Sequence, residues 1–210
     1  MAFADLPEEE AAVQIFQESL RRDRLAHAYL IASGNSDAAE SFALQIAKTL
    51  NCEAPTGKVS EGLGTDSCGE CQRCRQIQAH QQADVTWIRP ESKSRIITIA
   101  QIRSVLDKVH LKAHGAPFKV IIVVAAERMN IQAANAFLKT LEEPPAGSVL
   151  LLLTTDPHRL LDTILSRCLR ITLSSKKSMT ADVEGYNWLN QLCDRTLNGR
   201  RGAGTRYHIL

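Results

Sequence analysis

The chain has 210 residues, which is enough for one large α/β domain with a small appendage. Its 25 lysine and arginine residues nearly balance 23 aspartate and glutamate residues, and the resulting charge of +2 argues against nucleic acid as the sole partner. No apolar run approaches the ~20 residues of a membrane-spanning helix. The acidic start, MAFADLPEEE, does not have the pattern of a signal peptide, so we expect a cytoplasmic protein with no membrane partner.

Residues 8–24 have the apolar spacing of a charged amphipathic helix, and residues 28–32 are expected to form the first core strand. His27 stands directly before this strand. It could act as a ligand or a base, but nothing nearby completes a site, so we expect a packing role.

Residues 33–41, SGNSDAAES, lie between this strand and an amphipathic helix, where a phosphate-binding loop belongs. Such a loop needs glycines for close backbone approach, a lysine for the phosphates, and a serine or threonine for magnesium. Asp37 and Glu40 instead have the D-x-x-E spacing of a capping box. Two carboxylates at a helix start would repel a triphosphate, so this pattern favours a self-capped helix without a nucleotide.

Four of the six cysteines form a metal-binding pattern. Cys68, Cys71 and Cys74 have C-x₂-C-x₂-C spacing, and Cys52 ends the helix before them. Four thiolates suit tetrahedral zinc, and a site with four protein ligands is closed and structural. The alternative is a redox C-x-x-C pair, but such a pair follows a strand in a βαβ unit that is not evident here. We expect the other two cysteines to be buried or free thiols.

Residues 84–88 alternate as in a strand, and residues 96–113 begin extended and continue as an amphipathic helix. The loop between them is basic, but it also holds Glu91. This mixture favours a solvated loop over a contact with DNA.

Two buried strands, each followed by a helix, are predicted in the next segment. The runs at 119–126 and 148–155 are apolar, as is typical of strands covered on both faces. Asn130 can cap the helix between them, Pro144 can end it, and a short helix is expected from about Pro157. This order of elements predicts a covered parallel sheet.

The same segment carries three separated motifs: NAFLKTLEEPP at 135–145, Thr154-Thr155, and Ser166-Arg167-Cys168. In this order and spacing they resemble the bacterial DNA polymerase III clamp loaders, the AAA+ gamma/tau and delta-prime subunits. The resemblance covers residues 25–173. It implies an α/β fold with a RecA-like parallel sheet of five strands flanked by helices.

The resemblance also implies a domain organisation. Residues 1–173 would form an AAA+ nucleotide-binding-like domain, with a zinc module inserted at about 52–80. The fifteen residues between Cys52 and Cys68 are more than we expect in the family. Residues 174–210 would hold a short helix around Trp188 and a flexible tail, too little for the family's helical collar, so we expect a short form without it.

The family's nucleotide site maps onto residues that lack the required chemistry. Its glycines, lysine, hydroxyl and two Walker B acids fall, in that order, at Ser33, Ser36 and Ala38, Ala39, Glu40, and Val124 with Ala125. Valine and alanine can neither bind a cation nor orient water. We therefore expect no ATP at this chain's own site and no ATPase activity of its own.

Two further roles follow from the resemblance. Thr154 and Thr155 match the family's sensor position. Arg167 would be presented to the ATP of a neighbouring subunit, where a guanidinium supplied in trans stabilises transition-state charge. The alternative for Arg167 is a favourable position at a helix C-terminus.

Together these features imply an ATP-inactive, delta-prime-like subunit of the DNA polymerase III holoenzyme. Its partners would be the gamma/tau and delta subunits in a hetero-oligomer, with the sliding clamp and primer-template DNA reached through the complex. One alternative is a zinc-stabilised AAA+ remnant acting as a scaffold outside the clamp loader. Another is a DNA-binding zinc protein, against which the near-neutral charge and few aromatic residues argue.

Overall fold

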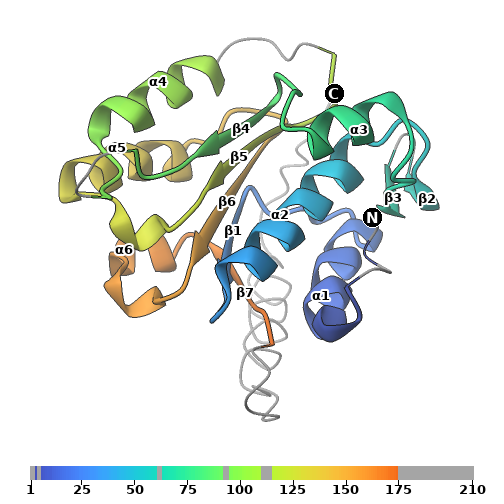
Figure 1. The fold of residues 1–210 in the computed structure, drawn as a ribbon, viewed down its shortest axis with the longest axis horizontal. Helices are drawn as coiled ribbons and strands as arrows, with labels where there is room; N and C mark the ends of the chain where they lie inside the picture. The colour runs from blue at the N-terminus through green and yellow to red at the C-terminus, as the bar shows by residue number, and fades with distance from the viewer. Residues whose placement is uncertain (1–2, 4–5, 61–62, 92–94, 110–114, 175–210) are drawn as a thin grey trace, which may run out of the picture. The chain divides into compact units, whose positions relative to one another are not determined.

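A computed structural model describes residues 3, 6–60, 63–91, 95–109 and 115–174 (Figure 1). The chain divides into two compact units, Met1–Ser175 and Lys176–Leu210, and every described residue belongs to the first. The helix predicted around Trp188, the tail after it and Cys193 lie outside the described residues.

The first unit is built on a five-stranded sheet with the order β4-β5-β6-β1-β7, in which every pair of neighbours is parallel. The strands are β4 (Val85–Ile88), β5 (Lys119–Val123), β6 (Ser148–Thr154), β1 (Ala28–Ala32) and β7 (Leu169–Thr172). This arrangement confirms the predicted parallel sheet of five strands.

Helices cover both faces of the sheet (Figure 1). They are α1 (Glu10–Arg21) and α2 (Ser36–Asn51) on one side, and α4 (Ile99–Val109), α5 (Ile131–Glu142) and α6 (Asp162–Leu165) on the other. Every residue of β1 and β6 is buried, because these strands lie inside the sheet and are covered on both faces. This burial on both faces explains the apolar runs from which strands were predicted at 28–32 and 148–155, the second of which ends at Thr154.

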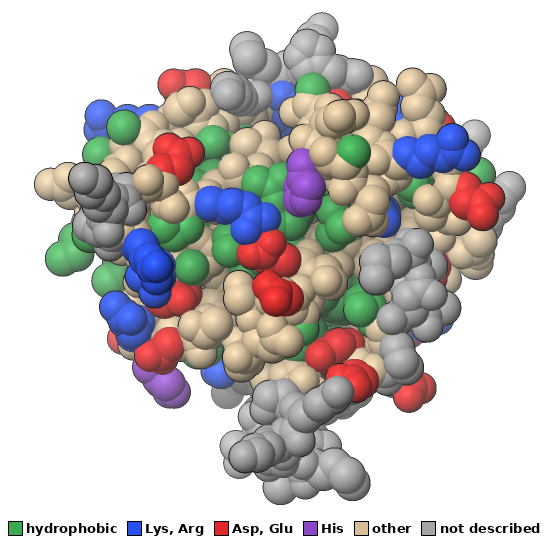
Figure 2. Space-filling model, viewed as in Figure 1, with side chains coloured by type: hydrophobic (Ala, Val, Ile, Leu, Met, Phe, Trp, Pro, Cys, Tyr) green, Lys and Arg blue, Asp and Glu red, His purple; other side chains and the backbone are tan. Residues whose placement is uncertain are grey.

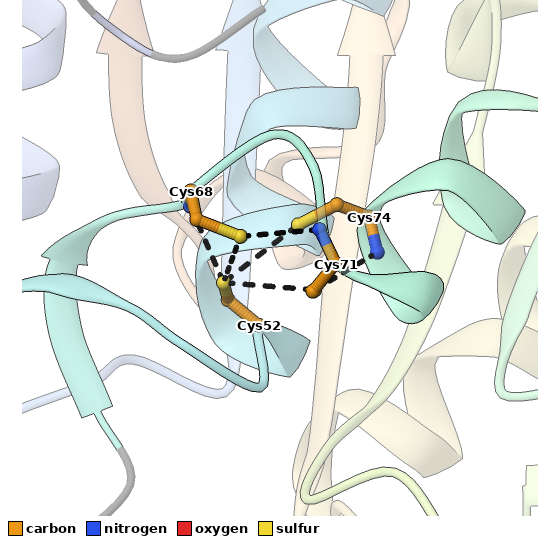
Figure 3. Close-up of side chains that lie close together, drawn as sticks. All are labelled: Cys52, Cys68, Cys71 and Cys74. Atoms are coloured by element: carbon orange, nitrogen blue, oxygen red, sulfur yellow. Dashed lines mark hydrogen bonds between the residues drawn. The ribbon is translucent and has the colours of Figure 1, made fainter.

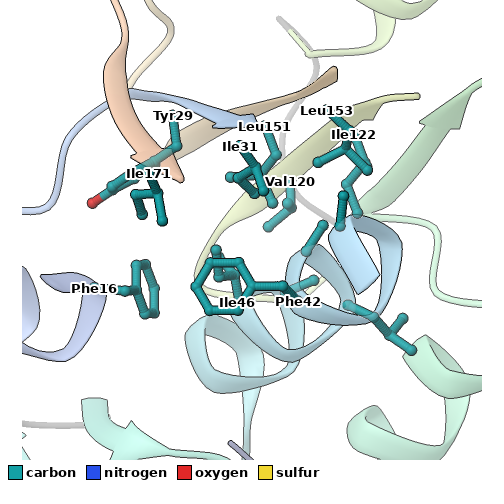
Figure 4. Packing of buried hydrophobic residues seen from close by; sticks show 14 of the residues in the cluster. Phe16, Tyr29, Ile31, Phe42, Ile46, Val120, Ile122, Leu151, Leu153 and Ile171 are labelled. Carbon is teal, nitrogen blue, oxygen red and sulfur yellow. The ribbon is translucent and has the colours of Figure 1, made fainter. Parts of the chain in front are cut away.

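Alternate residues of each strand point into two separate cores. Tyr29 and Ile31 belong to the core under α1 and α2, whereas Ala28 and Leu30 belong to the core under α4 and α5. Figure 4 shows the first core, where Phe16 of α1 and Phe42 and Ile46 of α2 lie opposite strand residues such as Tyr29, Ile31, Val120 and Ile171.

The predicted strand at 119–126 is shorter in the structure. β5 ends at Val123, because Ala125 has a left-handed backbone (φ 53°, ψ 55°) and a 3₁₀ turn follows at Ala126–Arg128. The extended start predicted at residue 96 is limited to a single bridge between Ile97 and Met129. Among the described residues, no helix combines the length and the apolar character needed to cross a membrane.

The spacer after Cys52 is folded. It forms an antiparallel hairpin of β2 (Thr56–Ser60) and β3 (Leu63–Asp66), followed by α3 (Gln72–Gln78). Gly64 is required in this hairpin, because a Cβ there would overlap the carbonyl oxygen of Thr56. The sequence analysis predicted neither the hairpin nor α3.

Candidate metal centre and remnant of a nucleotide site

Four cysteine sulfurs lie within 4.8 Å of one another, brought together by the end of α2 and the start of α3 (Figure 3). The Sγ of Cys52 is 3.4 Å from that of Cys68, 4.0 Å from that of Cys71 and 3.7 Å from that of Cys74. Tetrahedral zinc with Zn–S bonds of ~2.3 Å places its ligands ~3.8 Å apart. The four predicted ligands therefore have the spacing of a closed metal site and could hold a metal ion.

Backbone amides point at these sulfurs. The N–H groups of Cys71 and Cys74 donate to the Sγ of Cys68 (3.3 Å) and Cys71 (3.4 Å), and the N–H of Cys68 donates to the Sγ of Cys52 (3.3 Å). Gly69 permits this turn with a φ of 74°. N–H donors favour the thiolate form, which is the form that binds metal.

The pKa values of the thiols reflect two opposing effects. Burial raises the pKa of Cys52 and of Cys74. Burial acts in the same direction on Cys68, but the N–H groups of Glu70 and Cys71 and the neighbouring thiols outweigh it and lower the pKa to about 7. A metal ion would supply the positive charge that the buried thiolates lack.

Outside this cluster, burial raises the pKa of the Cys168 thiol to about 12, as expected for a buried cysteine. The packing role predicted for His27 is wrong. Its side chain is exposed, and its carbonyl oxygen accepts from the N–H of Leu150 in β6 at 2.9 Å.

The start of α2 occupies the predicted phosphate-loop position, but its cap differs from the predicted one. Asn35 is the N-cap, and its side chain accepts from the Asp37 N–H at 2.9 Å. The capping box of Asp37 and Glu40 is wrong, because the helix begins at Ser36 and Asp37 lies in its first turn. Ala39, at the family's lysine position, is buried in the core.

Glu40 pairs with an arginine from another element. Arg89, directly after β4, donates from both terminal nitrogens to the two carboxylate oxygens of Glu40, each at 2.7 Å. Its guanidinium also lies 5.0 Å from the centre of the Trp87 ring. The sequence analysis assigned this arginine to a solvated loop, because nothing in the local pattern shows a partner 49 residues away.

The end of β5 carries no metal-binding oxygen at the two Walker B positions. Val124 is buried and Ala125 half-buried. Glu127, two residues further on, instead accepts from the hydroxyls of Thr154 (2.7 Å) and Thr155 (3.1 Å) at the end of β6. The structure thus brings the predicted sensor pair to this edge of the sheet, where both hydroxyls are held by a carboxylate that the sequence analysis missed.

Arg167 follows Ser166, the C-cap of α6, and its side chain is 36% exposed. It donates to the carbonyl oxygen of Thr163 at 3.0 Å and to the carboxylate of Glu142, at the end of α5, at 2.9 Å. These contacts hold the guanidinium at the surface of the protein.

Comparisons with known proteins identify relatives of this domain. A family model described as "DNA polymerase III, delta subunit" matches residues 8–177. The tau subunit of Salmonella typhimurium DNA polymerase III is 35% identical over 173 residues, which are 82% of this chain and 25% of the relative. The delta' subunit of Pseudomonas aeruginosa is 36% identical over 149 residues, covering 71% of this chain and 43% of the relative.

A solved structure agrees with these relatives. A gamma subunit-related protein from Thermotoga maritima matches with a TM-score of 0.57 and 29% identity, over 77% of this chain and 47% of that one. The delta' subunit of Escherichia coli is 37% identical over 152 residues, covering 71% of this chain and 43% of the relative. This chain therefore spans less than half the length of these relatives. On the family match, the sheet and the motifs, it belongs to the DNA polymerase III clamp-loader family of AAA+ proteins, delta-prime type.

Proposed function

We propose that this chain is an ATP-inactive, delta-prime-like subunit of the bacterial DNA polymerase III clamp loader. The observation that carries the proposal is the paired state of the remnant site. Glu40 is bound by Arg89 at the head of α2, and Glu127 by two threonines at the end of β6. At this edge of the sheet, both carboxylates are therefore bound by other side chains of the same chain.

Electrostatics support the absence of nucleotide. A triphosphate at the start of α2 would lie beside the Glu40 carboxylate and would have no lysine at position 39 to balance its charge. Val124 and Ala125 would leave a magnesium ion without protein ligands at the end of β5. Hydrolysis of ATP by the isolated chain, abolished by Glu40→Ala, would show that this assignment of the site is mistaken.

The contribution of the chain to catalysis would then come from Arg167. Its guanidinium is partly exposed and rigidly held, which suits a group that acts on the ATP of an adjacent subunit. Arginines supplied in trans are worth about 10³–10⁵ in rate where they have been measured in GTPases. The neighbours would be the gamma/tau and delta subunits, which contact the sliding clamp and primed DNA within the complex.

The four-cysteine site would hold structural zinc. All four ligands come from the protein, so no position is open for a substrate. The amide donors to the sulfurs support zinc over a redox pair, because they stabilise several thiolates at once.

The test is the ATPase activity of the cognate gamma/tau motor with clamp and primed DNA, with and without this chain. We expect this chain to stimulate the motor, and Arg167→Ala to remove at least about 90% of that stimulation while still binding the motor. Arg170→Ala is the matched control, because Arg170 is an exposed arginine three residues further on, in β7.

Stimulation by Arg167→Ala equal to that of the parent would contradict the arginine-finger role. If neither chain bound clamp-loader subunits or stimulated the motor, that result would favour the second candidate, a zinc-stabilised scaffold outside the clamp loader. The ion pair of Arg167 with Glu142 is the observation that favours this candidate, since it gives the arginine a role within the chain.

A further inference from the structure

A groove of about 500 Å³ runs along the outer edge of the sheet, beside β4. All of its lining residues come from one continuous stretch of chain: His80, Gln81, Gln82, Ala83, Val85, Thr86, Trp87 and Arg89. Figure 2 shows hydrophobic side chains on the surface between α3 and β4, with basic and acidic side chains next to them. Of its lining residues, Arg89 also belongs to the remnant site, and the other seven belong to neither that site nor the metal centre.

The backbone of β4 has one unpaired edge in the described part of the chain. β4 is the first strand of the sheet, and the N–H groups of Val120 and Val124 in the β5 segment donate to the carbonyl oxygens of Asp84 and Ile88. In a parallel ladder, alternate residues bond to the same neighbour. The polar backbone groups of Val85 and Trp87 therefore point away from β5, toward the groove. Among the described residues, the one backbone partner on this side is the carbonyl oxygen of Gln82, which accepts from the Val85 N–H.

Trp87 provides a rigid wall for the groove. Its ring meets that of His80 edge-on at 4.8 Å between centroids, and the Arg89 guanidinium lies 5.0 Å from its centre. Its indole N–H is buried and has no acceptor among the described residues. Because this nitrogen is enclosed, Trp87 offers an occupant of the groove an aromatic surface and not its N–H.

The chemistry of the lining selects the occupant. The groove contains the side-chain donors of His80, two glutamines and Arg89, and none of the eight lining residues is acidic. Glu40 uses one N–H on each terminal nitrogen of Arg89, which leaves three of the five guanidinium N–H groups for another acceptor. An extended chain with a carboxylate side chain matches both the unpaired backbone edge and this set of donors.

We propose that the β4 edge binds an extended peptide segment of a partner protein, which adds as a strand and directs an acidic side chain toward Arg89 and His80. Backbone hydrogen bonds to Val85 and Trp87 would hold the strand in place, and the acidic side chain would select it. The length of β4 limits the paired segment to about four residues. The proposal is independent of whether Arg167 acts on ATP.

The experiment uses the full chain and a fluorescein-labelled peptide with the sequence Thr-Val-Glu-Val-Thr, titrated to about 1 mM and followed by fluorescence anisotropy. We expect saturable binding that weakens about tenfold when lysine replaces the peptide's glutamate, and about as much when alternate peptide nitrogens are methylated on one edge. Amide hydrogen exchange at Trp87 should slow by at least about tenfold with bound peptide.

Two variants separate recognition from folding. Trp87→Phe keeps an aromatic side chain but reduces the surface that lines the groove, and we expect it to weaken binding severalfold. Gln72→Ala, an exposed residue in α3 that does not line the groove, should bind as the parent does. The proposal is overturned by no binding at 1 mM peptide, by equal binding of the lysine peptide, or by unchanged exchange at Trp87. A dimer of this chain that the peptide dissociates would also overturn it, since the occupant would then be a second copy.

Discussion

At the scale of single residues, Ala125 carries a conformation that its side chain disfavours. It adopts φ 53° and ψ 55° at the position of the second Walker B acid. A Cβ in the left-handed region costs roughly 1–2 kcal/mol, whereas glycine adopts it freely. The turn at the end of β5 is therefore held by its surroundings and not by the preference of this residue.

Ala125→Gly should accordingly increase the free energy of unfolding, by about 0.5–1 kcal/mol, because the gain from relieved strain exceeds the added flexibility of the unfolded chain. Urea denaturation measures this change. Ala100→Gly, in the exposed part of α4, is the control and should destabilise by about 1 kcal/mol. Destabilisation by both variants would mean that the Ala125 backbone is not left-handed in solution.

Glu9 predicts a dependence of stability on pH. It is almost completely buried; burial raises its pKa, the N–H of Ser174 opposes this with a 2.8 Å hydrogen bond, and the charge of Glu8 adds to the rise. A carboxyl whose pKa is higher in the folded state binds its proton more tightly there. The stabilisation that protonated Glu9 gives to the folded state is complete below the pKa of this carboxyl in the unfolded chain, ~4.3. It is lost as the pH rises through the pKa in the folded state.

Glu9→Gln should therefore be more stable than the parent at pH 7 and lose this advantage below about pH 4. Glutamine keeps an oxygen that can accept from Ser174 but carries no charge. Thermal unfolding across pH 3.5–7.5 measures the difference between the two chains. An advantage that stayed constant over this range would exclude titration of Glu9 as its cause.

The site residues that could be predicted from the sequence are those that form a pattern over a short stretch of chain. The four cysteines are recognised by spacing, and the structure brings all four sulfurs together. Arg89 and Glu127 were missed, because their partners lie 49 and 27 residues away and meet them only at the common edge of the sheet. The assignments of Arg167 and the zinc ion remain predictions.

At the scale of elements, the hairpin of β2 and β3 connects two of the candidate metal ligands, Cys52 and Cys68. A Cβ at Gly64 would overlap the Thr56 carbonyl oxygen and approach the Pro55 side chain at 2.8 Å. The hairpin would have to open to relieve this contact. Since β3 ends at Asp66, two residues before Cys68, the displacement would reach the metal ligands.

Gly64→Ala should thus destabilise the domain by about 1–3 kcal/mol and reduce the zinc retained after dialysis against a chelator. Zinc content and thermal unfolding give the two readouts. Gly115→Ala is the control for an added Cβ without a clash, because Gly115 has no atom within 4 Å of that Cβ. Its φ of 100° strains alanine, so we expect this variant to lose stability while it keeps its zinc. Equal zinc loss in both variants would mean that the hairpin does not support the site.

The elements also differ in how well the sequence predicts them. β1 and β6 are mostly apolar, because both of their faces are buried, and such runs can be recognised without a partner strand. The hairpin strands, TGKVS and LGTD, are short and contain glycine, so their pairing rather than their composition makes them strands. The four-residue strand β7 is also too short for a periodic pattern.

At the scale of the whole first unit, the cysteine module is tied to the core through the start of the chain. The N–H of Phe3 donates to both carboxylate oxygens of Asp66 at 3.1 Å. The Phe3 ring packs on Phe16 and Phe42, with centroids 5.8 and 5.7 Å apart. Asp66 therefore connects the segment that precedes the metal ligands to aromatic residues of α1 and α2.

Removal of the metal should loosen this connection before it unfolds the sheet. Without the ion, the four sulfurs would lose their common bonding partner, and the turn from Cys68 to Cys74 would lose its main constraint. Hydrogen exchange after chelation should accelerate at residues 63–78 and at the N–H of Phe3. The amides of β1 and β6 should stay protected, because they are paired on both sides inside the sheet and buried on both faces.

Asp66→Asn changes the contact with Phe3 without changing the metal ligands. It keeps one acceptor for Phe3 and none of the cysteine ligands changes, so we expect zinc to be retained while exchange at Phe3 increases modestly. If chelation instead released β1 and β6 together with the module, the metal would stabilise the whole unit as one cooperative structure, and Asp66 would not be the link that transmits its loss.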